Sequence, residues 1–497
     1  MEVLTPKLIL GIVAIYFLVL MIISYLTGKE ADNDSFFRAN KKSPWFLVAF
    51  GMVGASLSGV TFISIPGVVG AHGLNQGFSY MQVVFGYLLG YLVIATILLP
   101  LYYRLNLTSI YTFLEKRLGF FSYKTGAAYF LVSRILGASF RLYLVAIVLQ
   151  KFVLAQLGVP FWLTVLMTIL LIWVYTFKAG IKTIVWTDTL QTTCMLLAVG
   201  LTIYAIGHAM GMSLGELISL VRNSEYAQMF YFEGGWSDPN NFFKQFISGA
   251  LIAIVMTGLD QDMMQKNLTC KSLRHAQMNV ASFSIVLIFA NLLFLTLGAL
   301  LYIYASNIGL EIPTKTDQLF PTIALQHLSP MIGVIFILGL IAAAYSSADS
   351  ALTALTTSFC IDFLDFEKKE KMTAPEELKR TRFFVHIGFS VLLFSVIIAF
   401  NAINNTAVIN GLFKAAGYTY GPILALFTFG MFTTRLVNDK LVLYICLAAP
   451  ILAFILDKYD LFIGFKLGFL ILLVNAALTF IGLWFISKAK PEDAENE

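Results

Sequence analysis

Long apolar segments recur along this chain of 497 residues, separated by short polar stretches. Each has at least 18 residues, and an α-helix needs ~20 to cross a membrane, where backbone polar groups have to be satisfied without water. The segments cover residues 8–26, 45–70, 78–103, 125–152, 160–178, 184–208, 243–265, 278–305, 331–362, 383–403, 407–431, 440–457 and 463–487. The sequence therefore predicts an all-α integral membrane protein with about 13 transmembrane helices.

The composition excludes several other classes of protein. Only 12% of the residues are charged and 59% are hydrophobic, whereas soluble domains carry about 25% charged residues. The cysteines are scattered, which indicates neither a zinc site nor a disulfide framework; they are Cys194, Cys270, Cys360 and Cys446. The chain shows no paired nucleophile and histidine and no metal-ligand cluster, so we expect neither an enzyme nor an organic cofactor.

The basic residues predict the orientation. With the N-terminus outside, 23 of the 33 Lys and Arg residues fall in inward loops, 7 fall outside and 3 fall within spans. Cytoplasmic loops carry this excess in membrane proteins. We therefore expect a multi-pass membrane protein with a cytoplasmic C-terminus. A plasma membrane is the expected location, with the bacterial inner membrane as the leading candidate.

Two spans carry interruptions: "GMVGASLSGVTFISIPG" at 51–67 and "MTGLDQDMMQKN" at 256–267. Non-helical backbone at membrane depth is tolerated where protein or a water-filled cavity satisfies it. Small residues also serve helix packing, and that is the competing interpretation of either break alone.

The positions of the two breaks predict the architecture. If the first span is set aside, the two breaks fall in the first and the sixth of the next ten spans. The ten spans then divide into two halves of five, which have opposite topology because five is odd. This layout predicts a LeuT-type 5+5 inverted repeat. We expect a single transporter domain over 1–487, with an extra helix at 8–26, repeats at 45–208 and 243–431, a C-terminal helix pair at 440–487 and a cytoplasmic tail at 488–497.

A polar stripe lies inside the segment "AAAYSSADSALTALTTSF", residues 342–359. Its members share one helix face; they are Ser346, Asp349, Ser350, Thr353 and Thr357. Hydroxyls in membrane helices often bond back to the carbonyl four residues earlier, which is the competing interpretation. The carboxylate of Asp349 favours a site for a hard cation such as sodium.

Asp188, in "IVWTDTLQTT", is a second intramembrane carboxylate. It lies about six residues from Lys182, or ~9 Å along a helix, which lets it approach the polar stripe from the cytoplasmic side. An ion pair between Asp188 and a nearby lysine is the competing interpretation.

Five ordered motifs resemble the sodium:solute symporter family, over nearly the whole chain. They are "GASLSGVTFISIPG", "KAGIKTIVWTDTLQ", "GLDQDMMQ", "AAAYSSADSAL" and "YTYGPILALFTFGMF". The resemblance implies sodium as a coupling ion, bound between the first broken helix and the helix of the polar stripe. The ligands it implies are the carbonyl groups of Gly54, Leu57 and Ala343 and the hydroxyls of Ser346 and Ser347.

Bacterial sialic acid symporters are the members that the motifs resemble most. They imply a second sodium at Asp188, Ser346, Asp349 and Ser350. This sequence departs from them at Asp349, where those members have serine.

The same resemblance implies a set of solute-binding residues. It places hydroxyls of the first broken helix and a Phe-x-x-x-Gln pair at the solute; they are Ser56, Ser58, Thr61, Phe78 and Gln82. An arginine that pairs with the solute carboxylate aligns with Gly137 here. Arg134 and Arg141 lie on the same helix face, so either is a candidate, and pairing with an internal aspartate is the alternative.

We therefore predict sodium-coupled import of a small polar solute by alternating access, with sialic acid or another carboxylated sugar as the first candidate. A neutral sugar, a monocarboxylate or an amino acid are the alternatives. A membrane sensor and a channel are candidates from other classes. The expected partners are a small, anionic solute and the lipid bilayer, with no nucleic acid and no obligate protein partner.

Overall fold

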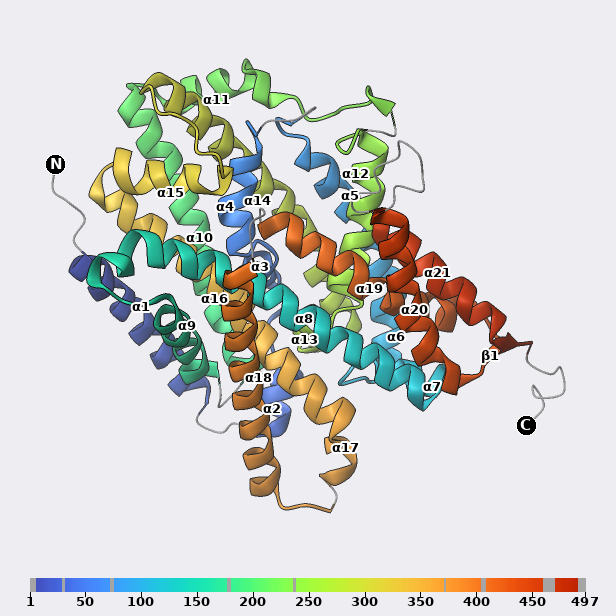
Figure 1. Ribbon diagram of the computed structural model, residues 1–497. Helices are drawn as coiled ribbons and strands as arrows, with labels where there is room; N and C mark the ends of the chain where they lie inside the picture. Colours follow the sequence, from blue (N-terminus) through green and yellow to red (C-terminus); the bar gives the residue numbers. More distant parts are fainter. Residues whose placement is uncertain are drawn as a thin grey trace.

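The computed structural model describes residues 6–28, 32–71, 76–176, 180–235, 238–370, 372–403, 408–458 and 470–489, and these are predominantly helical (Figure 1). The predicted tail at 488–497 lies almost entirely outside the described residues. The labels η mark short 3-10 or π-helical turns.

The helices of the predicted first repeat follow the expected order. They are α3 (Trp45–Ser56), α4 (Gly59–Val68), α5 (Tyr80–Val93), η2 (Ile94–Leu98), α6 (Leu99–Arg104), α8 (Phe120–Leu149), η3 (Gln150–Leu154), α9 (Phe161–Thr176) and α10 (Ile181–Met210). Those of the predicted second repeat are α12 (Phe242–Ala253), η7 (Ile254–Gly258), α13 (Gln261–Leu268), α14 (Leu273–Asn307), α16 (Pro330–Ser358), η10 (Phe359–Phe363), α18 (Pro375–Ile403) and α19 (Val408–Phe432).

Three further helices flank the two repeats: α1 (Pro6–Thr27), α20 (Asp439–Lys458) and α21 (Ile471–Phe485). Short elements fill the connections. They are α2 (Asn33–Arg38), η1 (Ala39–Lys41), α7 (Thr112–Arg117), η4 (Ala155–Leu157), α11 (Leu214–Arg222), η5 (Glu225–Ala227), η8 (Thr316–Gln318), α15 (Leu319–Thr322), η9 (Ile323–His327) and α17 (Phe366–Lys369). Strands β1 (Leu436–Val437) and β2 (Ser487–Lys488) pair antiparallel.

Each predicted apolar segment overlaps one or more described helices, and residues 463–469 of the last segment lie outside the described residues. Within the described residues, eight helices are long and apolar enough to cross a membrane, or ten if each of two bent pairs counts as one span. Helices α9 and α21 are shorter but also apolar. The structure thus agrees with a multi-pass membrane protein, while the number of 13 spans stays a prediction.

Both predicted breaks are present. Helices α3 and α4 meet at an angle of 57°, and the α12–η7 segment meets α13 at 64°. Asp260 caps α13, because its side chain accepts hydrogen bonds from the backbone N–H groups of Asp262 and Met263. The predicted span at 243–265 ends too early, since α13 continues to Leu268. This helix is polar but entirely buried, so hydropathy underestimates its extent.

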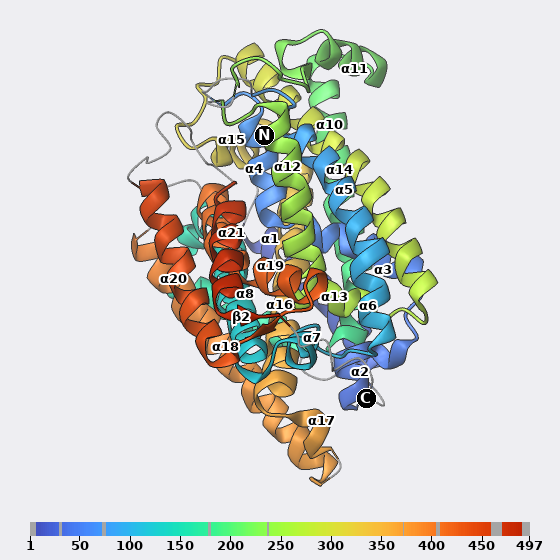
Figure 2. The ribbon, with the colours of Figure 1, turned by 90° about the vertical axis from the view of Figure 1, so that its right-hand side faces the viewer.

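The broken helices lie at the centre of the bundle (Figures 1 and 2). Helix α10 packs against both α16 and α3, α5 packs against α12, and α8 packs against α16 and α19. The short helices α11 and α15 lie at one end of the molecule, and α2 and α17 lie at the other (Figure 1).

Candidate functional site

The first break exposes backbone carbonyl groups in the interior of the bundle. Helix α3 ends at Ser56, Leu57 leaves the helical conformation with φ −84° and ψ 60°, and α4 begins at Gly59. The last four carbonyl groups of a helix have no partner within it. Among the described residues, the hydrogen bonds at this break go to the carbonyl groups of Val53 and Ser58, and neither a side chain nor a backbone N–H donates to those of Gly54 or Leu57.

This break lies directly against α16. A Cβ atom added at Gly59 would lie 3.6 Å from the Cα atom of Ala344, one residue after Ala343 and two before Ser346. Ser346 and Ser347 are fully buried there. The structure therefore brings the predicted carbonyl and hydroxyl ligands of the first sodium to the same region of the bundle.

Two hydroxyls of the polar stripe bond back to their own helix, as the competing interpretation expects, and the Thr353 hydroxyl has no hydrogen-bond partner among the described residues. Ser350 donates to the carbonyl of Ser346 at 2.8 Å, and Thr357 donates to that of Thr353 at 2.9 Å. Ser347 makes only long bonds, of 3.3 and 3.2 Å, to the carbonyl groups of Ala343 and Ala344. The Ser347 hydroxyl, next to the stripe, is thus weakly held and can turn towards an ion.

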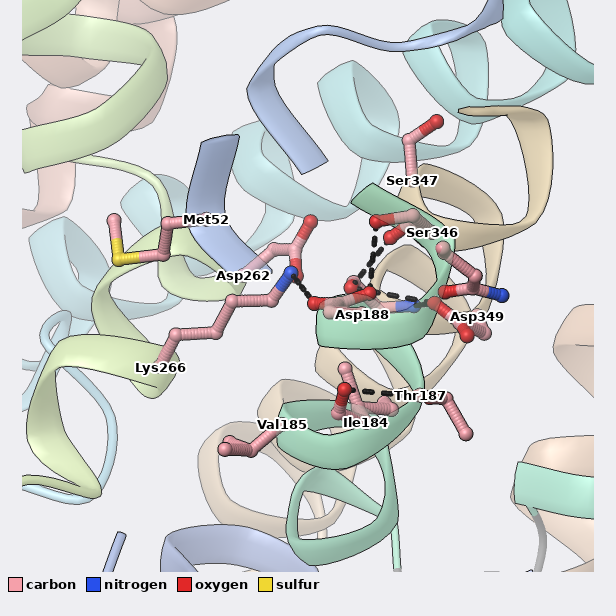
Figure 3. Close-up of polar contacts among 12 residues, drawn as sticks. Met52, Ile184, Val185, Thr187, Asp188, Asp262, Lys266, Ser346, Ser347 and Asp349 are labelled. Carbon is pink, nitrogen blue, oxygen red and sulfur yellow. Dashed lines mark hydrogen bonds and ion pairs between the residues drawn. The ribbon is translucent and has the colours of Figure 1, made fainter. Parts of the chain in front are cut away.

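Ser346 differs, because its hydroxyl donates to Oδ1 of Asp188 at 2.8 Å (Figure 3). Glycines on α3 let α10 approach closely: a Cβ atom added at Gly51 would lie 2.9 Å from the Cβ atom of Asp188. The second carboxylate oxygen of Asp188 accepts a hydrogen bond from the ammonium group of Lys266, at 2.6 Å. The ion pair between Asp188 and a lysine is therefore present.

Asp349 has different hydrogen-bond donors. Its carboxylate accepts from the Tyr175 hydroxyl on α9 at 2.8 Å and from the backbone N–H of Ser350 at 2.5 Å. Of the four residues implied for a second sodium, Asp188 and Ser346 are in direct contact. Asp349 is held by the Tyr175 hydroxyl and by the backbone N–H of Ser350.

A polar cavity of about 80 Å³ lies beside the first break. Three predicted solute-binding hydroxyls and both arginines line it: Ser56, Ser58, Thr61, Arg134 and Arg141. Its free space holds only a few water molecules. A sugar-sized solute therefore enters only when the surrounding helices move apart, as alternating access requires.

The two arginines have different surroundings. Arg134 forms an ion pair with Asp262 and lies 3.9 Å from the carboxylate of Asp260, so internal pairing is confirmed for Arg134. Arg141 is only 8% exposed and forms no salt bridge with any described residue. A second, small cavity is lined by both arginines and by Gly137, which confirms that all three share a helix face.

Phe78 and Gln82 do not line the cavity. Gln82 accepts a hydrogen bond from the backbone N–H of Tyr231 at 3.0 Å and donates to the carbonyl of Asn240 at 2.9 Å. Its amide is therefore used to hold the loop before α12, and the structure does not support direct solute contact by this pair.

Sequence reasoning missed several residues at these sites. Tyr80, Tyr87 and Tyr91 line the cavity from α5, and the first two hydroxyls hydrogen-bond each other at 2.9 Å. Their spacing of seven and four residues places them on one helix face, which is a signal present in the sequence. The predicted span at 243–265 leaves out Lys266, which is buried on α13.

Known proteins resemble this chain over most of its length. The sequence is 24% identical to the sodium/sialic acid symporter NanT of Aliivibrio fischeri, over 83% of this chain and 80% of that protein. It is 22% identical to the sodium/sialic acid symporter SiaT of Proteus mirabilis, over 83% and 82%. It is also 22% identical to the human sodium/iodide cotransporter, over 82% of this chain but only 62% of that longer protein.

Solved structures show the same fold. A substrate-bound, outward-open Na⁺-coupled sialic acid symporter superposes with a TM-score of 0.81 at 18% identity, covering 97% of this chain and 99% of that one. Mhp1, a nucleobase-cation-symport-1 family transporter, superposes with a TM-score of 0.56 at 16% identity, covering 91% and 94%. These likenesses confirm the predicted LeuT-type fold.

The family profile described as "Sodium:solute symporter family" matches residues 36–440, which include both broken helices, the polar stripe of α16 and both cavity arginines. This chain belongs to the sodium:solute symporter family.

Proposed function

We propose that this protein imports a small carboxylated solute together with sodium, and that sialic acid or a similar acidic sugar is its substrate. The observation that carries the proposal is Arg141, a buried guanidinium group that lines a hydroxyl-rich cavity with no salt bridge to any described residue. A buried charge without a partner is costly. A bound carboxylate supplies that partner in the two-pronged geometry that arginine favours.

The residues around the cavity fit an acidic sugar. Ser56, Ser58 and Thr61 offer hydroxyls beside Arg141, and Tyr80 and Tyr87 add phenol groups that can contact a sugar ring. Two of the similar proteins carry sialic acid in their names, which supports the same substrate class.

Monocarboxylate import is the second candidate. The cavity is only about 80 Å³, and a short carboxylate needs less widening than a nine-carbon sugar. The bovine sodium-coupled monocarboxylate transporter 2 is 24% identical over 81% of this chain and 64% of its own length. Both candidates share the negative charge that Arg141 would bind.

For sodium, we propose the site at the first break. The free carbonyl groups of Gly54 and Leu57, the carbonyl of Ala343 and the hydroxyls of Ser346 and Ser347 are hard oxygen ligands suited to such a cation. Sodium bound there joins the broken helix to α16, so it stabilises the arrangement that presents the cavity hydroxyls to the solute.

We also propose the orientation that the basic residues indicate, with the N-terminus outside and the C-terminus in the cytoplasm. The likeness to the symporters of Aliivibrio fischeri and Proteus mirabilis supports the bacterial inner membrane as the location. The domain division follows the predicted repeats at 45–208 and 243–431. The short helices α2 and α17, at one end of the molecule, then face the cytoplasm, and α11 faces the outside.

The proposed function predicts the stability of the purified protein in different solutions. Ligands that bind only the native state raise its free energy of unfolding, by about 2.7 kcal/mol at a concentration 100 times the Kd. We expect sodium to raise the melting temperature relative to potassium, and an acidic sugar or a monocarboxylate to raise it further only in sodium. If a neutral sugar raises the melting temperature further in sodium and neither acid does, the proposal of an anionic substrate is contradicted.

Replacing Ser347 with alanine tests the sodium site. Its hydroxyl makes only long bonds in the structure, so the variant leaves no buried partner unsatisfied. The variant loses the interaction between the Ser347 hydroxyl and the sodium ion, and one interaction with a charged group is worth about 1.5–3 kcal/mol. Sodium binding weakened by this amount corresponds to a roughly 10- to 100-fold higher sodium requirement for transport. Thr202→Ala is the matched control, because Thr202 bonds only to the carbonyl of Ala198 on its own helix. An unchanged sodium requirement in Ser347→Ala removes this residue from the ligand set.

A further inference from the structure

Lys266 is a charged side chain in the interior of the bundle. It is 1% exposed, and it lies near the end of α13, the second half of the second broken helix. A lysine in the interior of a membrane protein is rare and normally has a specific partner. Here the partner is Asp188 on α10, with 2.6 Å between the Lys266 nitrogen and Oδ2 (Figure 3).

Asp188 is the carboxylate to which the resemblance to bacterial sialic acid symporters assigns a second sodium. Both of its oxygens are in use: Oδ1 accepts the Ser346 hydroxyl at 2.8 Å and Oδ2 accepts the ammonium group. A sodium ion on the same carboxylate would lie within a few ångströms of the ammonium group. Like charges at that separation repel strongly in a dry interior. A second sodium therefore does not fit the site while Lys266 occupies it.

We propose that the ammonium group of Lys266 takes the place of the second sodium, as a cation covalently tethered to the protein. This inference rests on the proposed sodium symport. It assigns one exchangeable sodium to each transport cycle, bound at the first break. Lys266 supplies the positive charge that Asp188 requires, and it does so in every state in which α13 and α10 remain in contact.

The tethered cation also acts on the first sodium site. Because the hydrogen of the Ser346 hydroxyl is directed to Asp188, the lone pairs of that oxygen are left for a sodium ion. Lys266 is thus a positioning residue. It fixes the Asp188 carboxylate, which orients the Ser346 hydroxyl. The contacts of Asp188 with Lys266 and with Ser346 thereby connect α13 to a proposed sodium ligand on α16.

Asp349 does not restore a second site in this arrangement. Its carboxylate accepts hydrogen bonds from Tyr175 and from the backbone of Ser350, at the opposite side of Asp188 from Lys266 (Figure 3). The extra acid and the lysine both distinguish this cluster from a site built of one aspartate and several serines.

The test is a count of bound sodium ions. Equilibrium binding of radioactive sodium is measured on the purified full-length protein in potassium buffer without any solute, so the count does not depend on the substrate. We expect one sodium per wild-type chain and one in Lys266→Arg, which keeps the cation. We expect two in Lys266→Met, which frees Asp188, and one again in Lys266→Met with Asp188→Asn.

Two sodium ions per wild-type chain overturn the inference and leave the proposed function intact. This wild-type count decides the question even where a variant fails to fold. A single sodium in folded Lys266→Met also overturns the inference, because the freed carboxylate then holds no ion. No sodium in the wild type overturns the proposed sodium coupling itself, and the inference with it.

Discussion

Replacing Arg141 with glutamine is expected to weaken binding of an acidic solute by about 30- to 5,000-fold. That range corresponds to the ~2–5 kcal/mol lost when one partner of a buried charge pair is removed. The guanidinium group lines the cavity and has no salt bridge to a described residue, so the solute carboxylate is the interaction that the substitution removes. The measurement is solute-dependent stabilisation in sodium, followed by uptake into proteoliposomes.

Two comparisons separate this effect from damage to the fold. Arg141→Lys keeps the charge but loses the two-pronged geometry, so it should bind the acid better than glutamine and worse than the wild type. Sodium alone should stabilise all three proteins equally, because the proposed sodium ligands do not include Arg141. If Arg141→Gln transports the acidic solute with unchanged affinity, the arginine is structural and the substrate is not recognised by its charge there.

Replacing Gly54 with alanine is expected to abolish most sodium-dependent stabilisation. A Cβ atom at this position would lie 2.2 Å from Oγ1 of Thr192 and 3.3 Å from its Cα atom, so α3 and α10 have to separate. Overpacking of this kind costs about 1–3 kcal/mol. Separation would move the Gly54 carbonyl away from α16, so we expect the sodium requirement to rise by about tenfold or more.

The chain offers a matched control and a rescue for this substitution. Gly200 lies on α10 with no atom within 4 Å of an added Cβ, so Gly200→Ala should retain wild-type sodium dependence. Adding Thr192→Ala to Gly54→Ala removes the nearest atom and should restore part of the sodium response. Wild-type sodium dependence in Gly54→Ala alone would exclude the Gly54 carbonyl from the ion site.

The architecture was largely predictable because hydropathy and helix breaks are local signals. The segment around Leu57 and that around Gly258 combine glycine with polar residues inside apolar spans, and both are broken in the structure. The one-sided stripe from Ser346 to Thr357 likewise predicted a polar helix face in the interior. Such patterns depend on neighbours along one helix, which a single sequence contains.

The partners of the charged residues were harder to predict, because they come from other helices. Asp188 had two open interpretations, and only the position of α13 decides that Lys266 is its partner. Arg134 and Arg141 are equivalent in sequence, yet Asp262 reaches only the first. Gln82 was assigned to the solute by resemblance, whereas its amide is held by the loop at Tyr231 and Asn240.

A single coupling sodium has a consequence for energetics. One sodium and one monovalent anion carry no net charge across the membrane, so the potential of about 2.3 kcal/mol per charge at 100 mV does not drive this import. A tenfold sodium gradient alone then sustains about tenfold accumulation of the solute. Uptake driven only by a membrane potential should therefore be absent for an acidic substrate.

The two breaks differ in what satisfies their backbone. At the second, the hydroxyls of Tyr102 and Tyr111 donate to the carbonyl groups of Gly258 and Leu259, each at 2.9 Å. These donors belong to the protein, so the backbone oxygens of this break are satisfied without a bound ion. At the first break, the corresponding oxygens are the proposed ligands of a diffusible sodium ion. On the proposed sodium site, only the first break changes its backbone ligands with the sodium concentration, and the second break does not.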